Sequence, residues 1–494
     1  MPTIMMKLDE LLKNIEVEKV KGISDCFVSD LQYDSRQVEK DNAFVAVKGY
    51  ERDGHDFVLQ AQQQGARVFF VEKELNIPDV TQVIVKSTRK LLPEISRKFF
   101  YYPDKKLKAI GITGTNGKTT TAYLIYAILK FAKWKPGLLT TVEYYDGSSW
   151  IPAERTTPES LDIFRLFQSM VRSGLKSVVM EVSSHALSLN RVDGIQFMAN
   201  VFTNLGRDHL DFHGTLNDYF LAKRKLFENL NENQRVILNL DEPFSQKIMD
   251  MTQGEAFTYS MRKTDATVNY LEHSVDQNGM SISLRIPAGK ISIHTPLVGE
   301  FNIYNVMAAA TIAVSLGLHE DHVVSGLDNS PRIPGRCEYL ASPSGFSIYV
   351  DYAHTPDALQ NILRAIFETK PRKLIVVFGA GGDRDKGKRP LMGKAVENYA
   401  DRIILTNDNP RSEEPANIIN DIMAGISNKK KVLIIQDRRD AIHVALSMAE
   451  EKDAVVIAGK GHESYQEIAG IRYSLDDRLE IQNYFEKQKR AVNN

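Results

Sequence analysis

Cysteine is scarce in this chain of 494 residues, which contains only Cys26 and Cys337. The two thiols lie far apart in the sequence, so they supply neither a disulfide framework nor a zinc site built from several thiolates. Such low use of cysteine is typical of proteins in a reducing compartment. We therefore expect a cytoplasmic location.

Long apolar runs are also missing. No stretch approaches the roughly 20 uninterrupted apolar residues that a transmembrane helix needs, so we expect no membrane partner. Charged residues interrupt the apolar residues of segment 1–13, which predicts that this segment is not a signal peptide.

An excess of either charge is absent as well, because 62 Lys and Arg residues stand against 63 Asp and Glu residues, a net charge of -1. A surface that follows nucleic-acid phosphates needs a basic excess, so we expect no nucleic-acid partner. A local basic pocket for a small phosphate remains compatible with this balance. The length predicts several domains, and we expect the chain to act as a monomer.

Strands and helices are predicted to alternate through most of the chain. Residues 108–113 form a short apolar strand, and beyond a glycine loop Ala122, Ile125, Tyr126 and Leu129 fall on one face of a helix. Further strands are expected at 178–182, 199–203, 236–240, 374–378, 403–406, 432–435 and 454–458. Further helices are expected around 392–399, 418–426 and 441–449. This pattern predicts the α/β class, with mainly parallel sheets covered by helices on both faces.

Two turn-rich stretches suggest domain boundaries. Segment 101–106 precedes the first glycine-loop strand, and a cluster of prolines and glycines follows position 330. We predict three domains: an N-terminal α/β domain at 1–106, a central phosphate-loop domain at 107–335, and a C-terminal Rossmann-like domain at 336–494.

A glycine-rich loop follows the strand at 108–113 and opens the next helix. Its residues are Gly114, Thr115, Asn116, Gly117, Lys118, Thr119 and Thr120. Glycines let backbone N–H groups surround phosphate oxygens, and the helix N-terminus adds a favourable dipole. Lys118 would reach the β- and γ-phosphates, and the Thr119 hydroxyl would ligate magnesium. The strict pattern wants glycine where Ile112 stands, and a solvated glycine turn is the alternative.

A second glycine cluster follows the strand at 374–378. A dinucleotide-binding fingerprint would need glycine at the position of Arg384, so the dehydrogenase interpretation fails there.

Two acidic segments follow strands of the central block. Glu181 lies within an apolar strand, where a carboxylate is costly unless it is paired or bound to a cation. Because Mg²⁺ prefers oxygen ligands, we expect Glu181, Thr119 and nucleotide phosphates to form a magnesium site; the alternative is an edge strand with Glu181 facing water. Segment 208–213 holds two aspartates and two histidines without a zinc spacing, which favours a role beside magnesium or the γ-phosphate over zinc. Surface histidines are the plain alternative.

Seven segments resemble, in order, the motifs of the Mur ligases, which build the peptide stem of the bacterial cell-wall precursor. These segments are 113–120, 156–159, 181–185, 208–213, 301–305, 335–336 and 351–356. The resemblance spans nearly the whole chain and implies an ATP-dependent ligase with a UDP-sugar domain, a central ATPase and an amino-acid domain. In the implied reaction ATP phosphorylates a substrate carboxylate, and an amine then displaces phosphate from the acyl phosphate to form an amide.

The resemblance also implies roles for single residues. Lys118 would stabilise the transferring phosphoryl group, and Glu181 and His209 would organise magnesium. The nucleotide would also be held by Asn305, Arg336 and Asp351. The UDP-N-acetylmuramoyl dipeptide would be bound by Ser35, Thr156, Thr157, Ser183 and Arg191, whose hydroxyls and guanidinium suit a ligand rich in carboxylate and phosphate.

Lys223 matches a family lysine that is carbamylated. Carbamylation converts the cation into an anion, so the metal ligands would be Thr119, Glu181 and the carbamate of Lys223. The alternative is a solvated basic helix face that Lys223 shares with Arg224 and Lys225.

Three polar loops follow strands in the last third of the chain. Their candidate amino-acid-binding residues are Arg384, Asp408, Asn409, Pro410, Arg411, Gly459 and Glu463. Open α/β sheets bind ligands beyond the carboxyl ends of their strands, so these loops can converge on one ligand. Segment 408–411 resembles the motif of Mur ligases that add meso-diaminopimelate, whose distal carboxylate Arg411 would clamp. A surface turn would explain Asn409 and Pro410 but not the other two loops.

Other ligands and other functions stay open at this point. Lysine as the added amino acid lacks the distal carboxylate and would leave Arg411 unpaired. A ligase resembling folylpolyglutamate synthetase shares the central domain but explains neither segment 408–411 nor the N-terminal domain. A nucleotide switch of the GTPase kind would need an Asn-Lys-x-Asp motif, which the sequence lacks. Gly206, Arg207 and Thr140 differ from the residues expected for the family at these positions. These differences bear on the local geometry of the site and not on the class of enzyme.

Overall fold

The computed structural model describes residues 5–49, 52–276 and 279–493, so residues 1–4 of the N-terminal segment discussed above lie outside the described residues. The chain divides into two compact units. One comprises Met1–Gly111 and Trp134–Ala199, and the other comprises Ile112–Lys133 and Asn200–Asn494. The domain boundaries near 106 and 335 stay a prediction. In the described part of the chain no helix is both long and apolar enough to cross a membrane.

The first unit begins with a five-stranded sheet in the order β2-β7-β6-β5-β4. Its strands are β2 (Lys19–Lys21), β4 (Leu31–Gln32), β5 (Ala43–Val45), β6 (Val68–Val71) and β7 (Thr81–Ile84). All neighbours are parallel except β2, which runs antiparallel to β7. Helix α2 (Val58–Gln64) and the edge-to-face rings of Phe44 and Phe69 help to build its core.

Strands β1 (Met6–Lys7) and β3 (Phe27–Val28) form a separate pair, and five further strands lie in the order β11-β10-β9-β12-β8. They are β8 (Lys108–Thr113), β9 (Pro136–Leu139), β10 (Glu143–Tyr145), β11 (Trp150–Pro152) and β12 (Ser177–Glu181). Strand β12 runs parallel to β9, and every residue of β12 is buried. The helices nearby are α3 (Thr88–Phe99), α5 (Ser160–Arg172) and α6 (Ser184–Ser188).

The second unit contains the helix that follows the glycine-rich loop, α4 (Lys118–Phe131), which is buried along most of its length. Its strands continue in the order β13-β14-β15-β16-β17-β18. They are β13 (Phe197–Phe202), β14 (Arg235–Asn239), β15 (Glu255–Ser260), β16 (Val268–Asp276), β17 (Gly279–Ile286) and β18 (Gly289–Thr295). Strands β14 to β16 are parallel, whereas β16 to β18 form an antiparallel meander that the sequence reasoning missed. The helices here are α7 (Leu210–His213), α8 (Leu216–Arg224), α10 (Glu300–Ser315) and α11 (Glu320–Asp328).

The C-terminal sheet has the order β19-β20-β24-β21-β22-β23. Its strands are β19 (Glu338–Ala341), β20 (Ser347–Asp351), β21 (Leu374–Phe378), β22 (Arg402–Leu405), β23 (Val432–Ile434) and β24 (Ala454–Ala458). The neighbours from β20 to β23 are parallel, and only β19 is antiparallel. A separate hairpin is formed by β25 (Tyr465–Ile468) and β26 (Ile471–Ser474).

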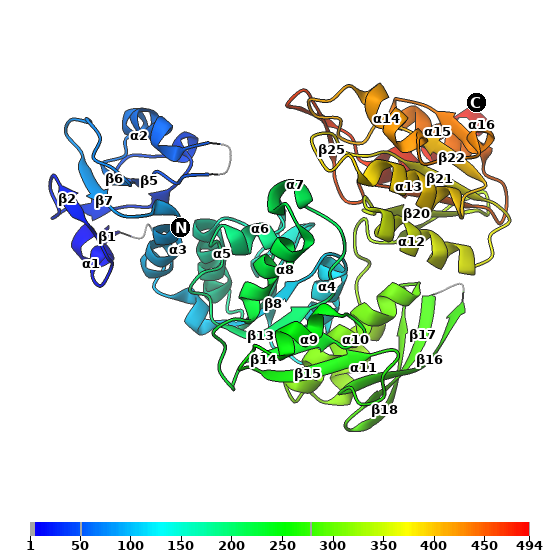
Figure 1. Ribbon diagram of the computed structural model, residues 1–494, viewed down its shortest axis with the longest axis horizontal. Coiled ribbons are helices and arrows are strands. Elements are labelled where there is room, and N and C mark those ends of the chain that lie inside the picture. The colour runs from blue at the N-terminus through cyan, green and yellow to red at the C-terminus, as the bar shows by residue number, and fades with distance from the viewer. Residues whose placement is uncertain (1–4, 50–51, 277–278, 494) are drawn as a thin grey trace. The chain divides into compact units, whose positions relative to one another are not determined.

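Helices cover both faces of this C-terminal sheet, as predicted (Figure 1). The helices are α12 (Pro356–Glu368), α13 (Lys388–Glu397), α14 (Pro415–Met423), α15 (Arg438–Met448) and α16 (Asp477–Asn493). Val376 and Phe378 of β21 pack in the core with α12, α13 and α14, while Ile375 and Val377 pack in the core with α15 and α16. The alternating side chains of one buried strand therefore serve two cores, which explains its continuous apolar sequence.

Candidate active site

The glycine-rich loop connects β8 to α4, as the sequence predicts. Gly114 has φ +149°, and a Cβ atom there would lie 1.9 Å from the Thr203 hydroxyl. Gly117 has φ +83°, and a Cβ atom there would lie 2.3 Å from Asn305 Oδ1. Only glycine fits both positions, because any larger residue would collide and would also strain the backbone at Gly117. The loop is therefore packed closely against its neighbours and is not a solvated turn.

Two lysine ammonium groups meet at one carbonyl of this loop. Lys118 Nζ donates to the carbonyls of Gly114 and Thr115, at 3.0 and 2.8 Å. Lys223 Nζ donates to the same Gly114 carbonyl at 2.8 Å and is only 1% exposed. Burial, with the nearby charge of Lys118, holds the pKa of Lys223 well below its usual range. The solvated-helix alternative for Lys223 is therefore wrong, because its amine is buried against the glycine-rich loop.

The predicted nucleotide residues Thr119 and Arg336 are in contact. Arg336 donates from Nη2 to the Thr119 hydroxyl at 3.0 Å, and its guanidinium lies 4.6 Å from the ring centre of Tyr352. The Asp351 carboxylate accepts the backbone N–H groups of Cys337 and Ala353 at 2.6 and 2.7 Å. Burial raises the pKa of Asp351, although the positive charge of Arg336 acts to lower it. Asp351 thus anchors the segment that carries Arg336.

Asn305 lies beside the same loop, on α10. Its Oδ1 atom accepts from the Thr121 hydroxyl at 3.3 Å, and its Nδ2 atom donates to Asn302 at 2.9 Å. The structure thus brings Asn305 together with Gly117 and the start of α4, and its role in nucleotide binding stays a prediction.

Asp208 is the centre of a second charged group near α7 and α8. Its carboxylate lies 3.4 Å from Nε2 of His209 and 3.8 Å from Nε2 of His354. Burial opposes ionisation, yet the charges of His209, His354 and Lys388 hold the pKa of Asp208 well below its usual range. The reasoning from sequence assigned no role to His354 or Lys388. His354 lies in segment 351–356, one of the seven segments that resemble the family motifs, so its sequence position could have indicated a role. Lys388 lies in none of these segments, and no residue near it in the sequence indicates that it interacts with Asp208.

Glu181 is 1% exposed at the end of β12, so the interpretation as a water-facing edge residue is wrong. Thr141 supplies two donors to its carboxylate, the backbone N–H at 2.9 Å and the hydroxyl at 3.1 Å. A buried carboxylate held by hydroxyl and N–H donors keeps lone pairs for a cation.

The predicted sugar-peptide residues cluster around Glu181 in the first unit. The Thr141 hydroxyl also contacts the Thr156 hydroxyl at 3.1 Å, and the Thr157 hydroxyl donates to the Glu181 carbonyl at 2.9 Å. The Thr157 hydroxyl accepts the backbone N–H of Ser183 at 3.0 Å. Three of the predicted residues, Thr156, Thr157 and Ser183, are thus linked through neighbouring hydroxyls.

Arg191 joins this group from the other side of Thr157. It donates to the Thr157 carbonyl at 3.1 Å and pairs with Glu159 at 3.4 Å, which in turn binds Arg89 at 2.7 Å. Neither Glu159 nor Arg89 was assigned a role from the sequence. Ser35 is buried and donates to Gln60 at 2.9 Å, and no hydrogen bond in the described residues joins it to the Thr157 group.

The three polar loops of the C-terminal sheet converge, as expected from their places after β21, β22 and β24. Arg411 donates to the Gly382 carbonyl at 2.6 Å, and Asn409 donates from Nδ2 to Glu463 at 2.8 Å. A Cβ atom at Gly459 would lie 2.5 Å from Asp408, so these loops also touch there. Arg411 itself adopts the left-handed φ of 53°, a strained conformation typical of functional positions.

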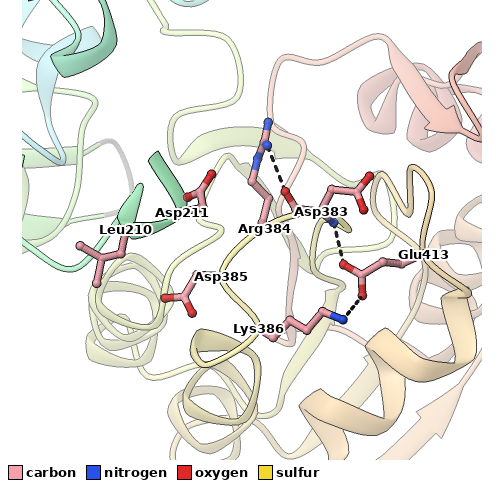
Figure 2. A pocket seen from close by; sticks show the side chains of 7 residues that line it. All are labelled: Leu210, Asp211, Asp383, Arg384, Asp385, Lys386 and Glu413. Atoms are coloured by element: carbon pink, nitrogen blue, oxygen red, sulfur yellow. Dashed lines mark hydrogen bonds and ion pairs between the residues drawn. The ribbon is translucent and has the colours of Figure 1, made fainter. Parts of the chain in front are cut away.

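A cavity of about 370 Å³ adjoins the first of these loops. Figure 2 shows Asp383, Arg384, Asp385 and Lys386 on one side and Leu210 and Asp211 of α7 on another. Glu413 accepts the backbone N–H of Asp383 at 2.6 Å and pairs with Lys386 at 3.3 Å. Arg384 donates to the Asp383 carbonyl at 3.1 Å. Charged groups of both signs therefore surround a space large enough for a small polar ligand.

The two departures from the family pattern each have a structural account. Arg207 pairs with Asp385 at 3.2 Å, which links the segment before α7 to the Arg384 loop. The Thr140 hydroxyl donates to the Glu143 carbonyl at 3.0 Å and so closes the turn between β9 and β10.

Three family models match consecutive parts of this chain. The Mur ligase family, catalytic domain, matches residues 28–107; the Mur ligase middle domain matches 112–313; and the Mur ligase, glutamate ligase domain, matches 335–461. Two relatives are both named UDP-N-acetylmuramoyl-L-alanyl-D-glutamate--2,6-diaminopimelate ligase. That of Aquifex aeolicus is 44% identical, with 93% of this chain and 92% of its own chain covered. That of Clostridium perfringens is 43% identical, with 97% of this chain and 100% of its own chain covered.

The chain belongs to the Mur ligase family. A solved structure described by the same ligase name matches over 98% of this chain and 99% of its own, with a TM-score of 0.67 and 31% identity. The three-domain α/β architecture of the Mur ligases is thus confirmed, and so is the class of enzyme, an ATP-dependent, ADP-forming amide ligase.

Proposed function

We propose that this Mur ligase adds meso-diaminopimelate to UDP-N-acetylmuramoyl-L-alanyl-D-glutamate, as the names of its relatives state for them. The observation that carries the proposal is the convergence of Arg411, Asn409 and Glu463 at the ends of β22 and β24. Diaminopimelate has an ammonium and a carboxylate at each end. A site that combines a guanidinium and an amide with Glu463 and Asp408 offers partners for both groups of one end.

The chemistry follows from the nature of the substrates. A carboxylate is a poor electrophile, so its oxygen is first bonded to the γ-phosphorus of ATP, with ADP leaving. The amine of the amino acid then attacks the acyl carbon of this acyl phosphate. The tetrahedral intermediate expels inorganic phosphate, and the amine loses its proton as the amide bond forms. Lys118 supplies positive charge beside the phosphoryl group that moves in the first step.

Magnesium fits the oxygen donors available in this chain. Among the described residues no cluster of three or more His, Cys, Asp and Glu is arranged for a metal, but a site completed by nucleotide phosphates needs none. We assign the Thr119 hydroxyl, the buried Glu181 carboxylate and a carbamate on Lys223 as its protein ligands, with His209 as a supporting residue. The ion would neutralise charge on the β- and γ-phosphates when bound.

Lys223 is suited to carbamylation because only an uncharged amine attacks carbon dioxide. Burial lowers the pKa of Lys223, so its amine is neutral at a lower pH than that of an exposed lysine. We expect protein equilibrated with ¹³C-labelled bicarbonate to show a carbamate ¹³C signal in its NMR spectrum. The signal should be absent from Lys223→Arg and retained in Lys225→Arg, which alters an exposed neighbour. A signal that persists in Lys223→Arg would assign the modification elsewhere.

ADP release tests the proposed function. We expect release with ATP and the UDP-muramyl dipeptide to depend on meso-diaminopimelate and to fall strongly when L-lysine replaces it. Preference for lysine would overturn the choice of amino acid. Turnover with a folate in place of the sugar nucleotide would favour a folylpolyglutamate-type ligase, and release that ignores the amino acid would favour a nucleotide switch.

A further inference from the structure

Lys460 is a buried cation beneath the three C-terminal loops. It follows β24, its side chain is 0% exposed, and its ammonium donates to Asn409 Oδ1 at 3.1 Å and to Glu463 Oε2 at 2.9 Å. A lysine is rarely buried completely, because its charge loses hydration unless it is paired. Lys460 satisfies this requirement with two side chains that the previous section assigns to the amino acid.

The contacts of Lys460 determine which way the Asn409 amide faces. Asn409 Oδ1 accepts from the Lys460 ammonium and also from the backbone N–H of Glu467 at 2.9 Å. An ammonium and a peptide N–H can only donate, so the amide oxygen must face them and the amide nitrogen must face away. That nitrogen donates to Glu463 Oε2 at 2.8 Å.

The same contacts use only one of the two oxygens of the Glu463 carboxylate. Among the described residues, its hydrogen bonds from Lys460 and Asn409 both end on Oε2, which leaves Oε1 as an acceptor for a ligand. Asn409 Nδ2 has a second N–H that can donate to a ligand. The site therefore has a donor side, formed by Asn409 and Arg411, and an acceptor side, formed by Glu463.

We propose that Lys460 is a positioning residue that sets this polarity, so that the donor side takes a carboxylate and the acceptor side takes an ammonium of the amino-acid substrate. The inference rests on the proposed function, since it assumes that the three loops bind an amino acid. Without Lys460 the Asn409 amide oxygen would keep only the Glu467 N–H as a donor, and the Glu463 carboxylate would lose its cation, so both side chains would be held less firmly toward the ligand.

A second buried cation, Arg438, lies beneath the same sheet edge and has an ion-pair partner of its own. Arg438 and Asp477 are both 0% exposed and form a pair at 2.7 Å, and Arg438 also donates to the Ala458 carbonyl at 3.0 Å. Removal of the Lys460 charge therefore leaves this pair and the end of β24 in place.

Steady-state kinetics of the full-length enzyme test the proposal with Lys460→Met and Lys460→Gln. We expect the KM for diaminopimelate to rise by about tenfold or more in Lys460→Met, because the charge-assisted hydrogen bonds to Asn409 and to Glu463 are lost together. The KM values for ATP and for the UDP-muramyl dipeptide should stay within about twofold, since the nucleotide loop is untouched. Lys460→Gln keeps one donor for Asn409 Oδ1 and should recover part of the loss.

Lys431→Met is the matched control. Its ammonium donates to the Ala400 carbonyl at 2.9 Å in the same domain, away from the three loops, so all KM values should remain near those of the parent. Asn409→Asp tests the same inference with Lys460 in place, because it replaces the donating amide nitrogen by an acceptor of similar shape. Its KM for diaminopimelate should also rise by about tenfold or more, even if both Lys460 variants fail to fold.

A fall in kcat with an unchanged KM for diaminopimelate, in Lys460→Met or in Asn409→Asp, would overturn the role of Lys460. Failure of the proposed function is distinguishable, because the parent enzyme itself would then ignore diaminopimelate. In that case the amino acid that the parent does use becomes the varied substrate, and the same comparison of variants applies.

Discussion

Replacing Lys118 by alanine is expected to lower the rate of ADP formation by about 10³-fold or more. The ammonium lies within the loop, on the carbonyls of Gly114 and Thr115, where it can turn outward to a phosphate without moving the backbone. As charge shifts onto the departing ADP and the transferring phosphoryl group, a fixed cation lowers the barrier more than it stabilises bound ATP. The loss should therefore appear mainly in kcat.

The measurement is single-turnover ADP formation at saturating substrates, with the thermal unfolding midpoint measured in parallel. Lys130→Ala, an exposed lysine in the last turn of the same helix, is the control and should retain the parent rate. A normal unfolding midpoint with little activity would support a catalytic role for Lys118. Activity close to that of the parent would mean that this loop is not where phosphoryl transfer occurs.

Replacing Arg411 by alanine is expected to lower kcat/KM for diaminopimelate by about 10²- to 10³-fold and to remove most of the preference over lysine. Arg411 donates to the Gly382 carbonyl at 2.6 Å and is 22% exposed, so its guanidinium is held in place and still reachable by a ligand. A planar guanidinium can bind a carboxylate through two parallel hydrogen bonds, and lysine as a substrate lacks the distal carboxylate that would accept them.

Competition between the two amino acids in one reaction gives the preference directly, with products separated by mass. Arg411→Lys should recover little, because an ammonium keeps the charge but not the paired geometry. Arg402→Ala, an exposed arginine at the start of β22, serves as the control. A selective loss of lysine use in Arg411→Ala would contradict the assignment of this residue to the distal carboxylate.

Short apolar runs of strand length made much of the fold predictable. The expected strands at 108–113, 374–378 and 454–458 coincide with β8, β21 and β24, since a parallel strand that is buried on both faces leaves a continuous apolar signal. The meander β16 to β18 was missed although Ile282, Leu284 and Ile286 alternate with more exposed residues in β17. That period of two is the sequence signal of a half-buried strand.

The candidate site was predictable where a motif carries its own mechanism, as in the glycine-rich loop and the Arg411 loop. It was not predictable where a buried charge acts through partners far away in the sequence. Lys388 influences Asp208, and Lys460 orients Asn409, but neither residue lies in a pattern that identifies its partner. Such pairings arise only when distant parts of the chain fold next to each other.

The close approach of Gly117 and Asn305 has an evolutionary consequence. The Asn305 amide occupies the space that a side chain at Gly117 would need. Asn305 also accepts a hydrogen bond from the Thr121 hydroxyl. A side chain gained at 117 alone would collide, and a smaller residue gained at 305 alone would open a gap and leave that hydroxyl without its acceptor. A substitution at either position alone is therefore opposed by the packing of the other, so the two positions constrain each other.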